Sequence, residues 1–356
     1  MCILNVNINE TEKNYPIYIS NKNIDNLQTS IMQEVGNNNY IVVISQKVFN
    51  LYSKLLNFPK EKVFILKDGE KEKNIKNYTK ILEFALSKKL TRKDYIIAVG
   101  GGVAGDLAGF AASTYMRGIN YIQVPTTLLA CTDSSVGGKT AINTKYGKNL
   151  VGAFYQPKAV FINVNFLKTL DERQYKSGLG EVLKYGFIEK NSEQNEEPNL
   201  INFLSQNYEK ILNKDILTLI ELIKICIKIK ISVVEKDEKE NNLRMILNLG
   251  HTYAHALEVI SNYKYTHGEC VSKGTAKAFN IALKLGKIDK EYKFICEDLI
   301  KKFEFQQIPE YNKNKIIQIM TSDKKSQNGK IKYVLPVGYA QVETFDFTPE
   351  ELTDIL

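Results

Sequence analysis

No part of the 356-residue sequence carries an uncharged apolar run that approaches the roughly 18 residues of a membrane-spanning helix. Its five cysteines lie far apart and form no Cys-x-x-Cys pair, which fits reduced thiols better than a disulfide framework. The amino-terminal segment lacks the basic stretch and apolar run of a secretory signal. These absences predict a soluble cytoplasmic protein.

The sequence also contains no basic stripe interleaved with aromatic residues, the pattern typical of nucleic-acid-binding proteins. The net charge of +8 is spread along the chain. This distribution favours anionic small molecules as ligands and disfavours nucleic acid. The length exceeds what one hydrophobic core usually supports, which predicts two domains.

Strand-like apolar runs alternate with helix-like segments through the first half of the chain, which predicts βαβ units around a mostly parallel sheet. After about residue 169 the apolar spacing is helical, apart from a short strand expected at 331–335. We therefore predict an α/β Rossmann-like nucleotide-binding domain at residues 1–170 and a mainly helical, all-α metal and substrate domain at 171–356. The expected strands are Tyr15–Ile19, Tyr40–Ser45, Lys62–Leu66, Tyr95–Val99, Tyr121–Val124 and Val160–Val164, and the clearest helices are Ile75–Lys88 and Val103–Thr114.

Histidine is scarce, and all three histidines lie within residues 244–269, RMILNLGHTYAHALEVISNYKYTHGE. An amphipathic helix with a wet polar face would explain the spacing, but imidazole, guanidinium and amide groups also bind metals, anions and hydroxyls. Gly250 inside such a helix is unfavourable, which predicts that something large approaches the backbone there. Read as one helix, the segment places five polar side chains on one face: Arg244, Asn248, His251, His255 and Glu258.

Glycines follow the fourth expected strand in the order Gly100-Gly-Gly-Val-Ala-Gly-Asp106, which matches GxGxxG between a strand and a helix. Such glycines let the backbone approach a pyrophosphate at a helix N-terminus; a tight turn is the alternative. The acidic residue that usually binds the ribose about 20 residues further on is absent. We therefore expect a variant scheme in which Asp106 or the turn Asp68–Lys73 contacts the nucleotide, although that turn could also be a solvated charged loop.

Two glycine-flanked segments, expected to be loops, offer further cations: Lys139, and Lys148 with Asn149. The first segment ends like a P-loop, but Asp133 stands where GxxxxGK[ST] requires glycine, so an ATPase is disfavoured. The two lysines and the amide suit a phosphorylated or carboxylated substrate. A surface position is the alternative for each of them.

Helical phase singles out Lys230, which falls about 180° from Glu221 in the middle of an apolar face. We expect this lysine to meet an anion or a binding site inside the protein. The alternative is a helix that ends near Ile229, so that the lysine turns outward. Glu181 and Lys184 lie one turn apart, either as an ordinary surface pair or as a metal ligand beside a substrate lysine.

A metal site is a further expectation. Catalytic zinc usually takes three His or carboxylate ligands and keeps one position open. His251 and His255 have the i, i+4 spacing of helical zinc sites but lack the glutamate of HExxH, so a metalloprotease is disfavoured. The sequence offers four candidate ligands: Glu181, His251, His255 and His267.

Together these segments resemble the 3-dehydroquinate synthase family of the sugar phosphate cyclase superfamily, over nearly the whole chain. There are two departures. Ala254 stands where glycine is usual, and Ser45-Gln46 replaces Thr-Asp, which puts an adenosine-ribose contact from that strand in doubt. The segments that carry the resemblance are Asp68-Gly-Glu-Lys-Glu-Lys73, Gly100-Gly-Gly-Val-Ala-Gly-Asp106, Met116-Arg-Gly118, Gln123-Val-Pro-Thr-Thr127, Asp133-Ser-Ser-Val-Gly-Gly-Lys139, Gly147-Lys-Asn149, Gly180-Glu-Val-Leu-Lys184, Leu243-Arg244, Asn248-Leu-Gly-His251, His255 and His267-Gly-Glu269.

The resemblance implies a dehydroquinate synthase-like fold that uses NAD and zinc, with cobalt as a substitute metal. It implies zinc ligands at Glu181, His251 and His267. It implies NAD contacts from Asp68, Gly69, Glu70, Lys71, Glu72, Lys73, Gly101, Gly102, Val103, Ala104, Gly105, Asp106, Thr126, Thr127, Asp133, Lys139, Lys148, Phe166, Leu167, Lys168 and Thr169. It implies substrate-binding or catalytic roles for Arg117, Lys139, Asn149, Lys184, Lys230, Arg244, Asn248, His255 and either Lys324 or Lys325.

The implied reaction converts 3-deoxy-D-arabino-heptulosonate 7-phosphate to 3-dehydroquinate and phosphate, the second step of the shikimate pathway to chorismate and the aromatic amino acids. The implied course is transient oxidation by NAD, phosphate elimination, re-reduction and intramolecular aldol closure. A homodimer without nucleic-acid or membrane partners is also implied.

Three alternatives remain. The first is a related cyclase that makes an inosose or valiolone, although the presence of both Lys230 and Arg244 favours a substrate with a carboxylate. The second is a polyol dehydrogenase, which would accumulate NADH. The third is a non-catalytic basic binding protein, which would contain no zinc.

Overall fold

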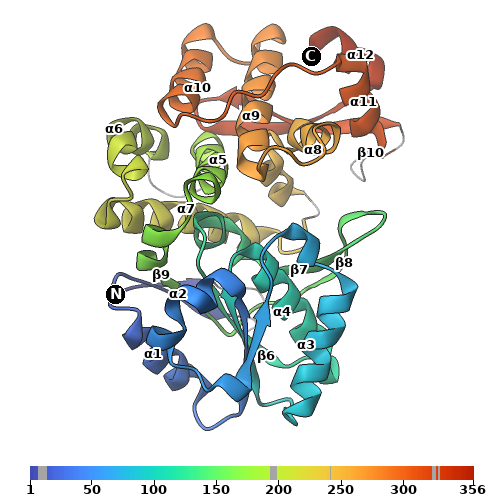
Figure 1. Ribbon diagram of the computed structural model, residues 1–356. Coiled ribbons are helices and arrows are strands. Elements are labelled where there is room, and N and C mark those ends of the chain that lie inside the picture. The colour runs from blue at the N-terminus through green and yellow to red at the C-terminus, as the bar shows by residue number, and fades with distance from the viewer. Residues whose placement is uncertain (7–13, 193–198, 241, 323–325, 328) are drawn as a thin grey trace. The chain divides into compact units, whose positions relative to one another are not determined.

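The chain folds into two compact units (Figure 1). One unit contains Met1–Leu170 and Leu219–Ile231, and the other contains Asp171–Thr218 and Ser232–Leu356. The segment Leu219–Ile231 therefore groups with the first unit, although it follows residue 170, where we expected a single boundary. The computed structural model describes all residues except 7–13, 193–198, 241, 323–325 and 328.

The first unit is built on a seven-stranded sheet in the order β1-β2-β9-β6-β5-β3-β4. Only the β1–β2 pair is antiparallel among these described neighbours. Parallel strands are buried on both faces, which explains their near-continuous apolar sequences. The strands are β1 (Cys2–Val6), β2 (Tyr15–Ser20), β3 (Tyr40–Ser45), β4 (Val63–Leu66), β5 (Tyr95–Gly100), β6 (Asn120–Pro125) and β9 (Ala159–Asn163).

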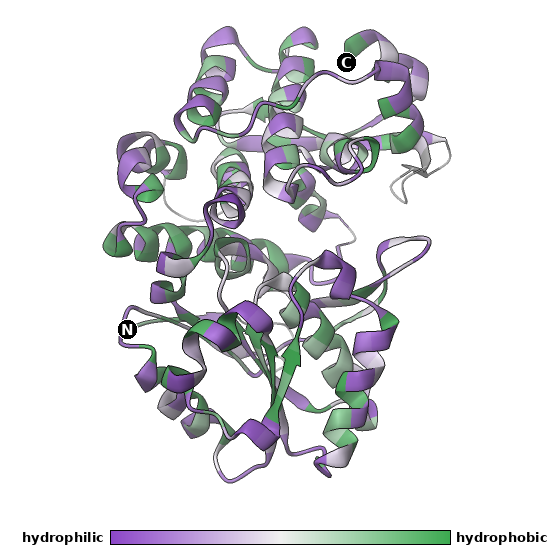
Figure 2. Cartoon of the chain, in the orientation of Figure 1, coloured by the Kyte–Doolittle hydropathy of each residue, from purple (hydrophilic) through white to green (hydrophobic). Residues whose placement is uncertain are grey.

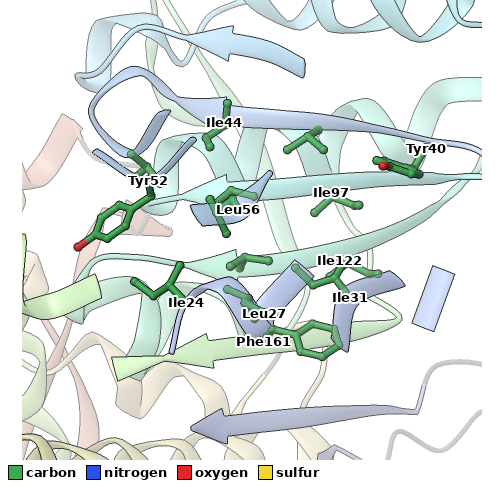
Figure 3. Packing of buried hydrophobic residues seen from close by; sticks show 14 of the residues in the cluster. Ile24, Leu27, Ile31, Tyr40, Ile44, Tyr52, Leu56, Ile97, Ile122 and Phe161 are labelled. Carbon is green, nitrogen blue, oxygen red and sulfur yellow. The ribbon is translucent and has the colours of Figure 1, made fainter. Parts of the chain in front are cut away.

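Helices cover both faces of this sheet. Alternate residues of β3 point to opposite faces, so Val42 and Ile44 pack in one core and Ile41 and Val43 in another. Figure 3 shows the first core, into which α1 and α2 contribute side chains such as Leu27 and Leu56. Figure 2 shows these strands mostly hydrophobic and the helices mixed in character. The helices of this unit are α1 (Asp25–Val35), α2 (Gln46–Leu56), α3 (Ile75–Ser87) and α4 (Gly102–Thr114).

The six strands expected in the first half are all present, with ends that differ by at most one residue from the prediction. The expected loops around Lys139, Lys148 and Asn149 are instead a two-stranded antiparallel hairpin, β7 (Lys139–Thr144) and β8 (Gly147–Phe154). The hairpin escaped prediction because β8 contains two glycines and no buried residue, so it lacks the apolar pattern of a buried strand.

The second unit is mainly helical, which confirms the predicted fold class. It also contains a three-stranded antiparallel sheet, and the strand expected at 331–335 lies in the central strand of that sheet. No helix among the described residues is long and apolar enough to cross a membrane. The elements are α5 (Glu172–Ile188), α6 (Leu200–Leu212), α8 (His251–Ile260), α9 (His267–Lys284), α10 (Lys290–Lys302), α11 (Lys313–Ser322), β10 (Ser326–Gln327), β11 (Lys330–Gly338), β12 (Gln341–Phe347) and α12 (Pro349–Ile355), with α7 (Ile216–Lys236) divided between the units.

Candidate functional site

The single helix expected through the histidine-rich segment is wrong. A 3₁₀ turn covers Leu243–Asn248, α8 begins at His251, and Gly250 between them has a left-handed φ of 77°. A Cβ on Gly250 would lie 2.6 Å from the Oγ1 atom of Thr275 and 2.8 Å from its backbone nitrogen. The group that approaches this glycine closely is therefore α9. The residues before Gly250 do not continue the polar face of α8.

Three side chains from three helices nevertheless meet in the second unit: Glu181 of α5, His251 of α8 and His267 of α9. The Nε2 atoms of His251 and His267 lie 3.2 Å and 3.0 Å from the same oxygen, Oε1 of Glu181. The candidate ligand atoms all lie within 4.8 Å of one another. Two imidazoles and a carboxylate are a donor set of catalytic zinc sites. The fourth candidate, His255, instead groups with Glu258 and His267.

Close contact between two helices brings part of this triad together. Gly180 precedes Glu181 on α5, and Gly268 follows His267 on α9. A Cβ on Gly180 would lie 2.2 Å from the carbonyl oxygen of Gly268, and a Cβ on Gly268 would lie 1.8 Å from that of Ser177. Only glycine allows the two backbones to approach this closely. Because Glu181 and His267 are the chain neighbours of these two glycines, the close approach of the helices places Glu181 beside His267.

We expect Gly180→Ala to lower the free energy of unfolding by about 3 kcal/mol, the upper part of the range for overpacking. The added methyl group would overlap the Gly268 backbone and push Glu181 away from His267, so zinc affinity should also fall. Urea unfolding and zinc titration measure the two effects.

The matched control for this variant is Gly186→Ala on the same helix. Its Cβ would meet no atom closer than Cγ1 of Ile201 at 3.3 Å, and alanine is favoured over glycine in a helix by about 1 kcal/mol. We expect this control to keep its stability and its zinc affinity. Equal behaviour of the two variants would contradict the role assigned to the glycine contact.

Charges within the triad are strongly coupled. Burial would raise the pKa of Glu181, but the Lys184 ammonium and His251 hold it well below its usual range. Lys184 is itself buried and forms an ion pair with Glu181. Burial lowers the pKa of His251 to about 4. Burial would also lower the pKa of His267, whereas hydrogen bonds with Glu181 and Glu258 raise it to about 10. The metal-free site therefore holds a proton on His267 that a bound cation would displace.

The loop before α8 orders a second set of polar side chains. The Asp237 carboxylate accepts the backbone N–H of Arg244 at 3.0 Å, and the buried Arg244 guanidinium donates to the carbonyl of Glu238. The Asn248 amide donates to Oε1 of Glu240 at 3.0 Å. Glu240 is not predicted from the sequence, because no motif or helical phase marks it. Its carboxylate is a further polar group beside Asn248.

In the first unit, the glycine turn lies at the carboxyl edge of the parallel sheet. β4 lies on one side of β3 and β5 on the other, so the direction of chain progression reverses between β3 and β5. Ligands of open α/β sheets bind at this kind of switch point. A Cβ on Gly101 would lie 2.9 Å from Cγ2 of Thr127, and Asp68 accepts the backbone N–H of Lys47 at 2.9 Å. Gly101 therefore has no room for a side chain beside Thr127; a dinucleotide site at this turn stays a prediction.

Two lysines of this unit pair with aspartates. Lys73 forms an ion pair with Asp106 and donates to Oδ1 of Asn149 at 2.5 Å. Burial raises the pKa of Asp106, and Lys73 opposes that shift. Helix α7 continues past Ile229, and Lys230 is buried and pairs with Asp133. The expectation that Lys230 meets an anion inside the protein is therefore confirmed.

Three expected contact residues, Phe166, Leu167 and Thr169, follow β9 and so lie at the same carboxyl edge of the sheet as the glycine turn. The side chains of Phe166 and Leu167 are buried hydrophobic residues, and the Thr169 hydroxyl bonds Tyr52 at 2.6 Å. Arg117 follows α4 and precedes β6, which places it at the amino edge of the parallel strands, opposite the glycine turn. Lys324 and Lys325 lie outside the described residues.

Comparison with known proteins assigns both parts of the chain. A family model described as 3-dehydroquinate synthase N-terminal matches residues 63–177, and one described as 3-dehydroquinate synthase C-terminal matches residues 178–326. The 3-dehydroquinate synthase of Dictyoglomus thermophilum is 43% identical over 342 residues, which cover 96% of this chain and 94% of the relative. The 3-dehydroquinate synthase of Alkaliphilus metalliredigens is 46% identical over 298 residues, which cover 83% of this chain and 82% of the relative.

Solved structures give the same picture of the fold. A 2-deoxy-scyllo-inosose synthase complexed with carbaglucose-6-phosphate, NAD⁺ and Co²⁺ is similar over 100% of both chains. Its TM-score is 0.84 and its sequence identity 25%.

Proposed function

The chain belongs to the 3-dehydroquinate synthase family, and from that membership we propose that it converts 3-deoxy-D-arabino-heptulosonate 7-phosphate to 3-dehydroquinate and phosphate. The observation that carries the proposal is the convergence of Glu181, His251 and His267 from three helices. The glycine turn in the other unit supports it, because transient oxidation of the substrate requires a dinucleotide as well as a metal.

We propose that Glu181, His251 and His267 hold zinc, with cobalt as a substitute. The donor set fits a catalytic zinc ion, since two imidazole nitrogens converge on one buried carboxylate oxygen. The similar inosose synthase, whose complex contains NAD⁺ and Co²⁺, supports the pairing of the two cofactors. When bound, the metal polarises a substrate hydroxyl and NAD accepts the hydride.

We propose that NAD binds at the carboxyl edge of the parallel sheet. Gly101 and Gly102 would expose backbone to the pyrophosphate at the start of α4. Polar groups at this edge of the sheet are Asp68, Thr127 and Asp106, the last held in place by Lys73. For Phe166 and Leu167 the backbone alone remains as a contact, because their side chains are buried.

We propose that charged and polar residues bind the phosphate and carboxylate of the substrate, with His255 as an acid/base or hydrogen-bonding group. The proposed residues are Lys139, Asn149, Lys184, Lys230, Arg244, Asn248 and His255. Ion pairs and hydrogen bonds fix several of these side chains before substrate binds, so their contribution is mainly to orient the reactive conformer. Arg117 is left out because it lies at the opposite edge of the sheet from the glycine turn.

Phosphate release tests this proposal. Purified protein supplied with NAD and zinc should release phosphate from the heptulosonate phosphate. A hexose 6-phosphate, which lacks the carboxylate, should give a kcat/KM at least about 100-fold lower, because polar groups that bind the carboxylate would be left unpaired. Release from the hexose phosphate alone would contradict the substrate and favour an inosose-forming cyclase, the second candidate, which the similarity to the inosose synthase supports.

We also propose that the protein is a cytoplasmic homodimer. The family resemblance supports the dimer. All five cysteines are free thiols, which is typical of a reducing compartment. Light scattering should give twice the chain mass of 40.6 kDa, and a mass of one chain would contradict the dimer.

A further inference from the structure

Both imidazoles of the triad face Glu181 with the same ring nitrogen, Nε2. Their other nitrogens have different partners. Nδ1 of His251 lies 3.1 Å from the backbone carbonyl oxygen of Leu249, and Nδ1 of His267 lies 3.2 Å from Oε1 of Glu258. A hydrogen on Nδ1 leaves the lone pair of a neutral imidazole on Nε2. Each ring thus has an acceptor that selects the tautomer able to bind a metal from Nε2.

The acceptor for His267 is the side chain of Glu258, a carboxylate that is buried. Glu258 is only 5% exposed, so its carboxylate has lost most of its water and gains by accepting a hydrogen bond from a ring N–H. The helix start that carries His267 is fixed separately by a capping box between Thr266 and Glu269. Glu258 is therefore not needed to fix the start of the helix, and its hydrogen bond acts on the imidazole ring of His267.

We propose that Glu258 is a positioning residue that orients His267 and fixes its tautomer for metal binding through Nε2. The inference rests on the proposed function, because it requires a metal held by Glu181, His251 and His267. A carboxylate that accepts the second N–H of a metal-bound histidine raises the basicity of the ring and fixes its plane. Loss of such a partner typically lowers metal affinity by about 10–100-fold.

A different arrangement would make Glu258 itself a ligand, because His255, Glu258 and His267 also lie close enough to hold an ion. That ion would use Nδ1 of His267. A neutral imidazole offers one lone pair and carries a hydrogen on the other nitrogen, so His267 cannot serve both groups in this form. The convergence of two Nε2 atoms on the buried Glu181 favours the triad. Cobalt binding to His255→Ala separates the two arrangements, because only the second one uses His255, so this variant should keep its cobalt affinity.

Cobalt binding to the metal-free protein tests the proposal without any measurement of activity. For Glu258→Ala we expect cobalt affinity, measured by competition with a chelator, to fall by about 10–100-fold, together with an altered visible absorption spectrum. Glu258→Gln keeps the size of the side chain and an acceptor oxygen, so it should recover part of the affinity and the spectrum. If the alanine variant does not fold, the glutamine variant alone tests the proposal. One ion per chain should bind in each protein.

The matched control is Glu269→Gln. It removes a buried carboxylate from the same helix start, but this carboxylate accepts the backbone N–H of Thr266 at 2.6 Å. We expect it to lower thermal stability while cobalt affinity stays within about twofold and the spectrum is unchanged, since a backbone cap contributes on the order of 1 kcal/mol to stability. An equal loss of affinity in this control would show that any lost negative charge has the same effect, which would overturn the proposal.

The remaining outcomes are also distinct. If the unaltered protein binds no cobalt or zinc, the proposed function fails together with this inference. If it binds one ion and Glu258→Ala binds it with the same affinity and spectrum, only the role of Glu258 is refuted. If His255→Ala loses as much cobalt affinity as Glu258→Ala, the ion is held by His255, Glu258 and His267; Glu258 is then a ligand, and its positioning role is overturned.

Discussion

His251→Ala should lose its metal and lower kcat/KM for phosphate release by at least about 1,000-fold. A catalytic metal contributes several kcal/mol to the transition state, and each 1.36 kcal/mol corresponds to about tenfold in rate. In the proposed site His251 supplies one of the three donors, and its ring is already oriented by the carbonyl of Leu249. Metal analysis of the purified variant and a phosphate-release assay measure the two losses.

His255→Ala is the comparison that makes this result specific. It removes an imidazole one turn along the same helix, with the two rings 5.6 Å apart between centroids. Loss of a proton-transfer group lowers activity by about 100-fold or more, while the metal content should stay at one ion per chain. A His251→Ala protein that keeps its zinc would contradict the ligand assignment.

Lys184→Met should destabilise the metal-free protein by about 3 kcal/mol, the lower end of the cost of breaking a buried ion pair, because the protonated His267 still contacts Glu181. Lys184 and Glu181 are each 1% exposed, so water cannot replace the lost ammonium. Saturating zinc should reduce the difference, because the metal would give Glu181 a new cationic partner. Urea unfolding with and without zinc measures both effects.

The chain offers a matched control in Lys224→Met. Lys224 pairs with Glu221 at 3.4 Å with the same spacing of three residues, but Glu221 is 48% exposed in its side chain. Exposed pairs contribute about 0–1 kcal/mol. The free energy of unfolding of this variant should therefore stay near that of the unaltered protein, both with and without zinc. A similar loss for both variants, or no recovery with zinc, would contradict the account of the Glu181 environment.

The elements that the sequence predicts well are those whose burial is set by local pattern. Strand β3 reads Tyr-Ile-Val-Val-Ile-Ser and is buried on both faces, so its apolar run marks it without other information. Lys230 is a similar case, because helical phase alone puts it on the apolar side of α7. The hairpin β7–β8 has neither signal, and only the pairing of its two strands reveals it.

The break at Gly250 could not be read from the sequence. Polar and apolar residues keep a helical spacing across it, and a single glycine is tolerated inside a helix. What ends the helix is contact with Thr275 and the carbonyl of Val271, more than 20 residues away in the sequence. Tertiary packing therefore decides the backbone conformation at this position.

The residues of the candidate site also differ in how strongly the sequence marks them. His251 and His267 stand out because histidine is rare, and Glu181 because the family motif marks it. Glu258 carried a weaker signal, since it lies one turn after His255 on the polar face. Glu240 carried none, because its approach to Asn248 depends on the fold of the loop before α8.

The most direct test of the central claim follows absorbance at 340 nm and phosphate in the same reaction, with the heptulosonate phosphate in large excess over enzyme and NAD. The account predicts that phosphate is released over many turnovers while NADH never exceeds the concentration of enzyme, because the cofactor is oxidised again within each turnover. NADH that accumulates in proportion to the substrate consumed, without phosphate, would identify a dehydrogenase and contradict the account.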